Sequence, residues 1–184
     1  MTRLWLVRHA RPLIEPGHCY GALDVPADAE DTQRAARNLA QQLPVGLMLR
    51  CSPLQRCTQL ACALTALRPD LRSHLDPRIA EMDFGHWEGQ RWDRLGAPAL
   101  DAWSADFAQH APGGGESVEV FMQRVSSAWD EQQGSGMPEA WITHAGVIRA
   151  ASLLARGLRC PQRADQWPVP APAFGEWQEM PTTP

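Results

Sequence analysis

The sequence lacks an excess of positive charge, because 17 basic residues face 21 acidic ones and the formal net charge is −4 at pH 7. Nucleic acids and anionic membrane surfaces bind through broad basic fields, so we expect neither as a main partner. A long apolar run is also missing. Residues 4–7 are closed off by Arg3 and Arg8 and are too few for a membrane span or a signal-peptide core. We therefore expect no membrane segment and no leader.

Regularly spaced cysteines are missing as well. The chain has five, an odd number without paired spacing, which argues against a disulfide framework. Cys51, Cys57 and Cys62 lie close together in the sequence, but their spacing is wrong for zinc. We expect free thiols, no zinc site and a reducing, cytoplasmic location.

The remaining composition is that of a globular protein. Hydrophobic residues make up 44% of the 184 positions and charged residues 21%, which argues against a largely disordered chain or a coiled coil. The sequence has no internal repeat and no linker-like stretch, so this length predicts a single domain over residues 1–184.

Apolar runs and helical patterns alternate along the chain. Residues 4–7, 45–49 and 140–143 are continuous apolar runs, typical of strands covered on both faces. A helix is predicted over residues 28–43, which end directly before Pro44. This alternation predicts an α/β fold with a mainly parallel sheet and a ligand site at the carboxyl ends of its strands.

Local signals predict three further elements. Ser52 to Gln55 has the pattern of a capping box, with proline at the first helical position, so a helix should begin there. Apolar residues recur at helical spacing over residues 118–129. Several prolines follow Pro161 and exclude a long helix, while residues 174–177 could add an edge strand.

Two histidines directly follow predicted strands. Arg8 and His9 come after the first apolar run, and His144 comes after the third, before a small-residue turn into a helix expected near Val147. Alone, an arginine-histidine pair is equally consistent with an ordinary surface pair. Because parallel strands present their carboxyl ends at one edge of a sheet, the two histidines together indicate a site.

Arg56 lies in the first turn of the helix predicted after Ser52. A positive side chain at a helix N-terminus is unfavourable by up to about 1 kcal/mol. An anion between the guanidinium group and the helix would remove the conflict, so phosphate is a candidate ligand. As a single clue, Arg56 would more simply be an exposed arginine.

Residues 81–89 mix carboxylates, aromatic residues and glycines, and resemble neither a regular helix nor a regular strand. They indicate a loop that contributes to a site. Glu81, Asp83 and Glu88 are all candidates for a general acid, and the pattern alone does not choose among them. His86 is consistent with a surface residue.

Five motifs, in this order, resemble those of the histidine phosphatase superfamily, which includes the cofactor-dependent phosphoglycerate mutases. They are Leu6 to His9, Cys51 to Ala61, Glu81 to Gly89, Pro112 to Ser117, and Thr143 to Arg149. The resemblance covers nearly the whole chain. It implies a three-layer α/β/α sandwich of the phosphoglycerate mutase type and a phosphatase that needs no metal and no other cofactor.

Carried over position by position, the resemblance makes His9 the nucleophile that forms a phosphohistidine. It makes Glu81 the acid that protonates the leaving group and then the base that activates water. The implied phosphate cradle consists of Arg8, Arg56 and His144. These cations would neutralise the phosphoryl oxygens in place of a metal, with His144 protonated while phosphate is bound.

The same resemblance gives roles to the neighbouring residues. Asp83 and Glu88 become structural. Tyr20 and Gly21 fall where the first long loop of the family approaches substrate, and the backbone N–H of Ala145 falls where a phosphate oxygen is bound.

The sequence departs from the family pattern next to the nucleophile. Ala10 replaces the usual glycine, and Arg11-Pro12 replaces an acidic or polar residue and a threonine. The extra methyl group is tolerated if φ is negative, whereas a positive φ would cost about 1 kcal/mol or more. Asp31 lies near the place of a glycine in the first helix, which concerns packing more than chemistry.

Within the superfamily, the chain resembles α-ribazole phosphatases of cobalamin biosynthesis in the sequences of residues 4–9 and 83–89 and in its short length. The implied partner is a small-molecule phosphate ester, first of all α-ribazole 5′-phosphate. Fructose-2,6-bisphosphatase-like and broad-specificity phosphatases have a similar sequence in the acid segment. The alternatives are a phosphoglycerate mutase-type phosphotransferase and an inactive family member that acts as a binding protein. The oligomeric state is open, and a homodimer is compatible with the sequence.

Overall fold

The computed structural model describes residues 3–168 and 170–181, which contain one five-stranded sheet in the order β3-β2-β4-β1-β5. The strands are β1 (Arg3–Arg8), β2 (Met48–Cys51), β3 (Arg72–Leu75), β4 (Glu139–Thr143) and β5 (Trp177–Pro181). Neighbouring strands are parallel, except that β5 runs antiparallel to β1. The predicted α/β fold with a mainly parallel sheet is confirmed.

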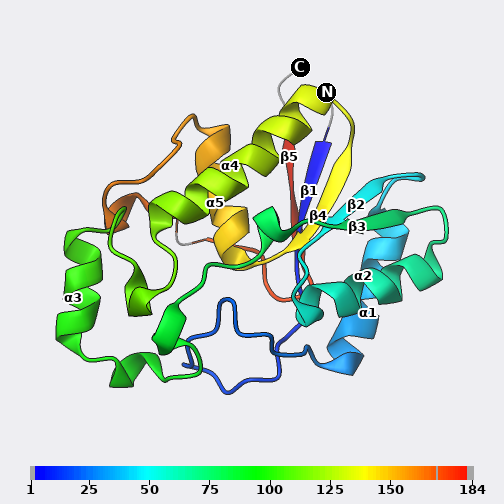
Figure 1. Cartoon of the computed structure of the whole chain (residues 1–184). Coiled ribbons are helices and arrows are strands. Elements are labelled where there is room, and N and C mark those ends of the chain that lie inside the picture. Colours follow the sequence, from blue (N-terminus) through cyan, green and yellow to red (C-terminus); the bar gives the residue numbers. More distant parts are fainter. Residues whose placement is uncertain (1–2, 169, 182–184) are drawn as a thin grey trace.

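Helices cover both faces of this sheet (Figure 1). The α-helices are α1 (Ala29–Gln42), α2 (Gln55–Leu67), α3 (Ala97–Ala105), α4 (Val118–Ser135) and α5 (Ala145–Ala155). Helices α1 and α2 pack on one face, α4 and α5 pack on the other, and α3 lies to one side of the sheet. The described part of the chain is therefore a three-layer α/β/α sandwich.

Alternation along β1 explains why its sequence is continuously apolar. Leu4 and Leu6 belong to the core beneath α4 and α5, whereas Trp5 and Val7 belong to the core beneath α1 and α2. Both faces of the strand are therefore buried. Each such side chain contributes about 2 kcal/mol by leaving water, which fixes the central strand that carries Arg8 at its end.

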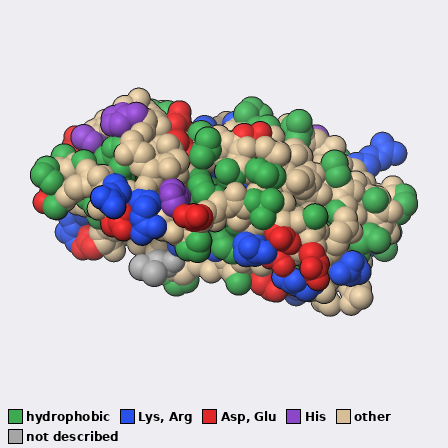
Figure 2. Space-filling model, turned by 90° about the horizontal axis from the view of Figure 1, so that it is seen from below, with side chains coloured by type: hydrophobic (Ala, Val, Ile, Leu, Met, Phe, Trp, Pro, Cys, Tyr) green, Lys and Arg blue, Asp and Glu red, His purple; other side chains and the backbone are tan. Residues whose placement is uncertain are grey.

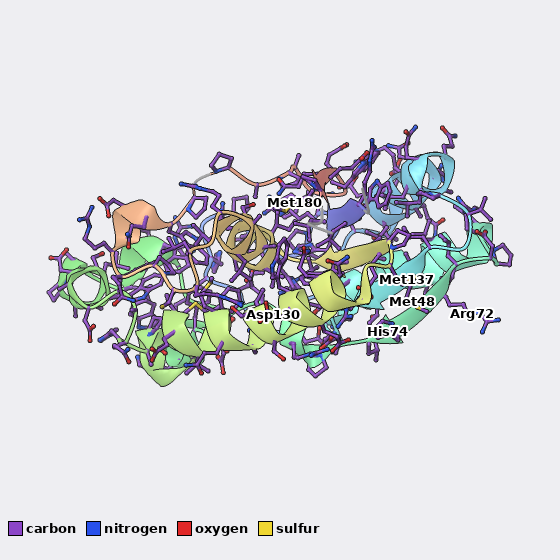
Figure 3. All side chains as sticks on the ribbon, turned by 90° about the horizontal axis from the view of Figure 1, so that it is seen from above. Met48, Arg72, His74, Asp130, Met137 and Met180 are labelled. Atoms are coloured by element: carbon purple, nitrogen blue, oxygen red, sulfur yellow. The ribbon has the colours of Figure 1, made fainter. Side chains whose placement is uncertain are left out.

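The two ends of the sheet differ in character. The loops that follow the carboxyl ends of the parallel strands gather at the lower edge in Figure 1. Seen from below, this face mixes acidic, basic and histidine side chains with apolar ones and has no broad basic field (Figure 2). At the opposite end, the exposed Met48 and Met137 lie at the amino ends of β2 and β4, and His74 lies on the edge strand β3 (Figure 3).

The helix predicted over residues 28–43 is confirmed as α1, with the Asp28 carboxylate accepting from the Asp31 N–H as an N-cap. The strand predicted over residues 45–49 begins later, as β2. Gly46 takes a positive φ of 72° and Val45 is 86% exposed, so the chain turns before the strand starts.

The capping box predicted at Ser52 is wrong, because α2 begins at Gln55 with Leu54 as its N-cap. The Ser52 hydroxyl lies 2.8 Å from a ring nitrogen of His144 instead. The Gln55 N–H donates to the carboxylate of Asp24, 2.7 Å away, so a residue from a distant loop caps this helix.

Two other boundaries also differ from the expectation. The strand expected at residues 174–177 begins only at Trp177, as β5. Residues 173–176 form a turn instead, closed by a hydrogen bond from the Glu176 N–H to the Ala173 carbonyl. The helix expected near Val147 begins at Ala145, directly after His144. No helix in the described ranges is long and apolar enough to cross a membrane.

Candidate active site

A cavity of about 530 Å³ opens at the carboxyl end of β1. One part of its wall is polar and includes Arg8, His9 and Glu81, while the other part is built mainly of aromatic side chains. The residues of the aromatic part are Phe84, Trp92, Trp103, Phe107, Phe121 and Trp167, whose rings contact one another. The ring of Tyr20 lies with the polar part, beside Arg8 and Arg56. The cavity thus has a charged end suited to an anion and an aromatic end suited to a planar group.

His9 forms part of the cavity wall at the end of β1 and is only 2% exposed. Its Nδ1 lies 2.7 Å from the carbonyl oxygen of Ala10. A carbonyl oxygen can only accept, so Nδ1 carries the proton and Nε2 carries the lone pair. Among the described residues only glycines have a positive φ, so the methyl group of Ala10 causes no strain here.

The surroundings of His9 disfavour its protonated form. Burial, followed by the charges of Arg56 and Arg8, lowers the pKa of His9 to about 3, although the Ala10 carbonyl opposes this shift. At neutral pH the ring is therefore a neutral imidazole with a free lone pair. This is the state that a nitrogen nucleophile requires.

Arg56 is fully buried in the first turn of α2. Its two terminal nitrogens donate to the carbonyl oxygens of Gly21, at 2.6 Å, and Leu23, at 2.9 Å. These contacts hold the guanidinium plane in one orientation. Its position confirms the expected placement at a helix N-terminus, although the side chain is buried rather than exposed to solvent.

His144 is fully buried next to His9 and, like Arg56, is not among the residues that line the cavity. Its ring centroid lies 5.2 Å from that of His9, and its Nε2 lies 2.8 Å from Ser52 Oγ and 3.5 Å from Cys57 Sγ. Complete burial and the positive charge of Arg56 keep the pKa of His144 well below its usual value. Protonation of His144 when phosphate is bound stays a prediction, because it requires the negative charge of the anion to offset the effects of burial and of the neighbouring cations on this pKa.

Three buried nitrogen atoms in the cradle have no hydrogen-bond partner among the described residues. They are Nε of Arg8, Nε of Arg56 and Nδ1 of His144. Leaving a buried donor unpaired costs about 1–3 kcal/mol, more for a charged group. The sequence reasoning placed these three residues in one phosphate cradle, and an anion with several oxygens would give each nitrogen a partner.

Glu81 is held by backbone groups on the cavity wall. Its two carboxylate oxygens accept from the N–H of Gly146 at 3.0 Å and from the N–H of Met82 at 3.1 Å. Arg124 fixes the backbone of the same segment, because its guanidinium group donates to the carbonyl oxygens of Ala80 and Glu81. Arg124 also pairs with Glu116, which ties the glycine-rich loop before α4 to the acid segment.

The other two acid candidates bind backbone. Glu88 accepts from the N–H groups of Gly21 at 2.7 Å, Ala22 at 3.0 Å and Phe84 at 2.9 Å. Asp83 is exposed and accepts from the Gly85 N–H at 2.8 Å. Of the three carboxylates, only Glu81 lines the cavity.

Tyr20 and Ala145 both line the cavity, and Gly21 does not. Tyr20 lies beneath the Arg56 guanidinium group, whose carbon is 5.4 Å from the ring centroid. Burial raises the pKa of Tyr20, while the charges of Arg8 and Arg56 oppose the shift. Gly21 binds Arg56 and Glu88 through its backbone instead, so its contact with the cavity is indirect.

Arg11 and Pro12 do not line the cavity. Arg11 pairs with the carboxylates of Asp28 and Asp31 at the start of α1, and Pro12 forms an isolated bridge with Ala27. The unusual Asp31 therefore has a partner in the equally unusual Arg11. Both departures concern the connection to α1.

Several cavity residues were missed by the sequence reasoning. Arg149 lines the cavity one turn beyond Ala145 on α5, and its spacing of four residues could have signalled this. The aromatic residues are scattered over the chain, so no local pattern could have grouped them. Phe174, whose ring lies 5.6 Å from that of His9, was missed for the same reason. In the described part of the chain, no group of three or more His, Cys, Asp and Glu side chains is arranged to hold a metal ion.

Known proteins that resemble this chain in sequence and structure include several phosphatases. The model of the histidine phosphatase superfamily (branch 1) matches residues 4–171. Proteins named adenosylcobalamin/alpha-ribazole phosphatase are similar to the chain: that of Escherichia coli (strain K12) is 31% identical over 174 residues, or 88% of this chain and 82% of the relative. That of Salmonella typhimurium is 29% identical over 171 residues, which cover 86% of this chain and 81% of the relative. A solved mycobacterial glucosyl-3-phosphoglycerate phosphatase has a TM-score of 0.79 and 25% identity, with 97% of this chain and 89% of that chain covered.

Proposed function

Because the chain belongs to the histidine phosphatase superfamily (branch 1) and is a phosphoric monoester hydrolase, we propose that it hydrolyses its substrate through a phosphohistidine on His9, without a metal. The observation that carries the proposal is the set of unpartnered nitrogens of Arg8, Arg56 and His144 around a neutral His9. A binding protein would need the cations but not a nucleophile whose tautomer is fixed.

In the first step, Nε2 of His9 attacks phosphorus and the bond from phosphorus to the ester oxygen breaks. The two guanidinium groups and His144 stabilise the charge on the non-bridging oxygens, which is the role a metal ion has in other phosphatases. Glu81, protonated at the start, gives its proton to the leaving oxygen. The product alcohol leaves, and the phosphoryl group stays on His9.

In the second step, a water molecule attacks the same phosphorus and the bond from nitrogen to phosphorus breaks. Glu81, now a carboxylate, takes the proton of this water. Inorganic phosphate leaves, His9 regains its lone pair and Glu81 regains its proton. The hydrogen bond from Nδ1 to the Ala10 carbonyl persists through both steps and keeps Nε2 directed at phosphorus.

We propose that the substrate is α-ribazole 5′-phosphate. The enzyme would then catalyse a step of cobalamin biosynthesis in a reducing cytoplasm. Two relatives are named adenosylcobalamin/alpha-ribazole phosphatase, and the aromatic end of the cavity supports a leaving group with a planar base. The five cysteines are all free, in keeping with a reducing compartment.

The test is hydrolysis of p-nitrophenyl phosphate and α-ribazole 5′-phosphate in excess EDTA. We expect turnover of both, lost in His9→Ala and retained in His74→Ala, a matched change on the exposed edge strand β3. Turnover that requires an added metal would contradict the phosphohistidine route. Turnover of p-nitrophenyl phosphate alone would contradict only the substrate, and a panel with fructose 2,6-bisphosphate and nucleoside monophosphates would then follow.

A further inference from the structure

The chain returns to the Arg-His pair near its C-terminal end. The N–H of Gly175 donates to the carbonyl oxygens of Arg8, at 3.2 Å, and His9, at 3.0 Å, and the Arg8 N–H donates to Glu176 at 2.9 Å. Gly175 has a φ of +76°, and a Cβ at this position would lie 2.9 Å from the side chain of Ala35. The turn therefore needs glycine, and it holds Phe174 at a fixed place beside the site.

The ring of Phe174 contacts both residues of the pair. The guanidinium carbon of Arg8 lies 3.9 Å from the centroid of this ring, and the His9 ring centroid lies 5.6 Å from it. One terminal nitrogen of Arg8 also donates to the carbonyl oxygen of Pro172 at 2.9 Å. Stacking uses the face of the guanidinium group, so that the in-plane Nε–H, which has no partner among the described residues, can bind an anion.

We propose that Phe174 is a positioning residue, which holds the Arg8 guanidinium group in its phosphate-binding orientation and covers one side of His9. This inference rests on the proposed function of His9. Arg8 is half-buried with an unpartnered Nε. Its guanidinium group is held from the C-terminal segment by the carbonyl of Pro172 and the ring of Phe174, and from the first long loop by a side-chain hydrogen bond with Tyr20.

Phe174 lies outside the core packing of the sandwich. The side chain is 37% exposed and belongs to neither of the two hydrophobic cores of the sandwich. The ring of Phe174 instead packs on a charged group and on the nucleophile.

The test compares Phe174→Leu, Phe174→Met and Phe174→Tyr with the wild type. The measurements are kcat and KM for p-nitrophenyl phosphate and the inhibition constants of inorganic phosphate and orthovanadate. A cation stacked on an aromatic ring contributes enough to change binding about tenfold. We expect both aliphatic variants to lose about tenfold in anion affinity and in kcat/KM, and the tyrosine variant to stay within about twofold of the wild type.

Thermal unfolding of each variant shows whether a loss of anion affinity comes from a loss of stability. Because Phe174 is partly exposed, we expect little change in Tm. The inference is overturned if the aliphatic variants keep wild-type anion affinity, or if tyrosine loses as much as leucine. Full turnover by His9→Ala would overturn the proposed nucleophile instead, while the anion affinities of the Phe174 variants would still report on the position of Arg8.

Discussion

The carboxylate of Glu81 and the backbone N–H of Gly146 are joined by a hydrogen bond of 3.0 Å. This contact links the proposed proton donor, which lies in a loop, to the first turn of α5 directly after His144. A Cβ at position 146 would overlap the Glu81 carboxylate. Gly146 is therefore needed for close approach, and the acid and the second histidine are positioned by the same turn.

We predict that Gly146→Ala displaces Glu81 and lowers kcat. A shift of about 1 Å in a reacting group can cost on the order of a hundredfold in rate. The matched control is Gly134→Ala in α4, where an added Cβ has no neighbour within 4 Å. The control should keep full activity and gain about 0.5–1 kcal/mol in stability. Equal kcat values for the two variants would contradict the proposed role of Glu81.

A second prediction concerns the stability of the fold in mild acid. Burial lowers the pKa of both His9 and His144 below the unfolded value of about 6.5. Below that pH the unfolded chain binds protons that the folded chain excludes, so the free energy of unfolding falls as the pH falls from about 6.5 towards 3. Each histidine contributes a slope of up to about 1.4 kcal/mol per pH unit.

Urea unfolding between about pH 6.5 and pH 5 isolates this effect from most carboxylates, which titrate lower. We expect His144→Asn to have a smaller slope than the wild type, and His74→Asn, changed at an exposed position, to keep the wild-type slope. A slope that is the same in all three proteins would contradict a neutral, buried His144.

A third prediction concerns the aromatic end of the cavity. Trp103 lines it and stacks on Phe107 with ring centroids 5.6 Å apart. Stacking of a base on an aromatic side chain is worth about 1–3 kcal/mol. We expect Trp103→Leu to lower kcat/KM for α-ribazole 5′-phosphate by about tenfold or more, and to leave ribose 5-phosphate, which has no base, nearly unchanged.

The matched control is Trp129→Leu, in α4 and outside the cavity wall. It should affect stability without changing the ratio of kcat/KM between the two substrates. The same loss for both substrates in Trp103→Leu would show that the ring supports the fold or the chemistry rather than the base.

The sequence predicted the central strands because burial on both faces leaves a continuous apolar run, as in residues 4–7 and 140–143. It did not predict β3, whose four residues are all exposed and carry no apolar pattern. Helix α3 was also missed, because none of its residues is buried and it has no apolar stripe.

The polar part of the site was predictable for a related reason. His9 and His144 directly follow the two clearest strands, so their meeting follows from the topology of a parallel sheet. The start of α2 was not predictable locally, because Ser52 contacts His144 and a distant aspartate caps the helix. Phe174 reaches the site through a turn that depends on its packing against α1.

The most direct test of the proposed mechanism is to trap the phosphoryl group on Glu81→Gln with p-nitrophenyl phosphate. Nitrophenolate needs little help to leave, so the first step should proceed, whereas the second step lacks its base. We predict a burst of nitrophenol and an alkali-stable, acid-labile phosphoryl group on the peptide that contains His9. Turnover without a burst, or a phosphoryl group on any other residue, would contradict the phosphohistidine on His9.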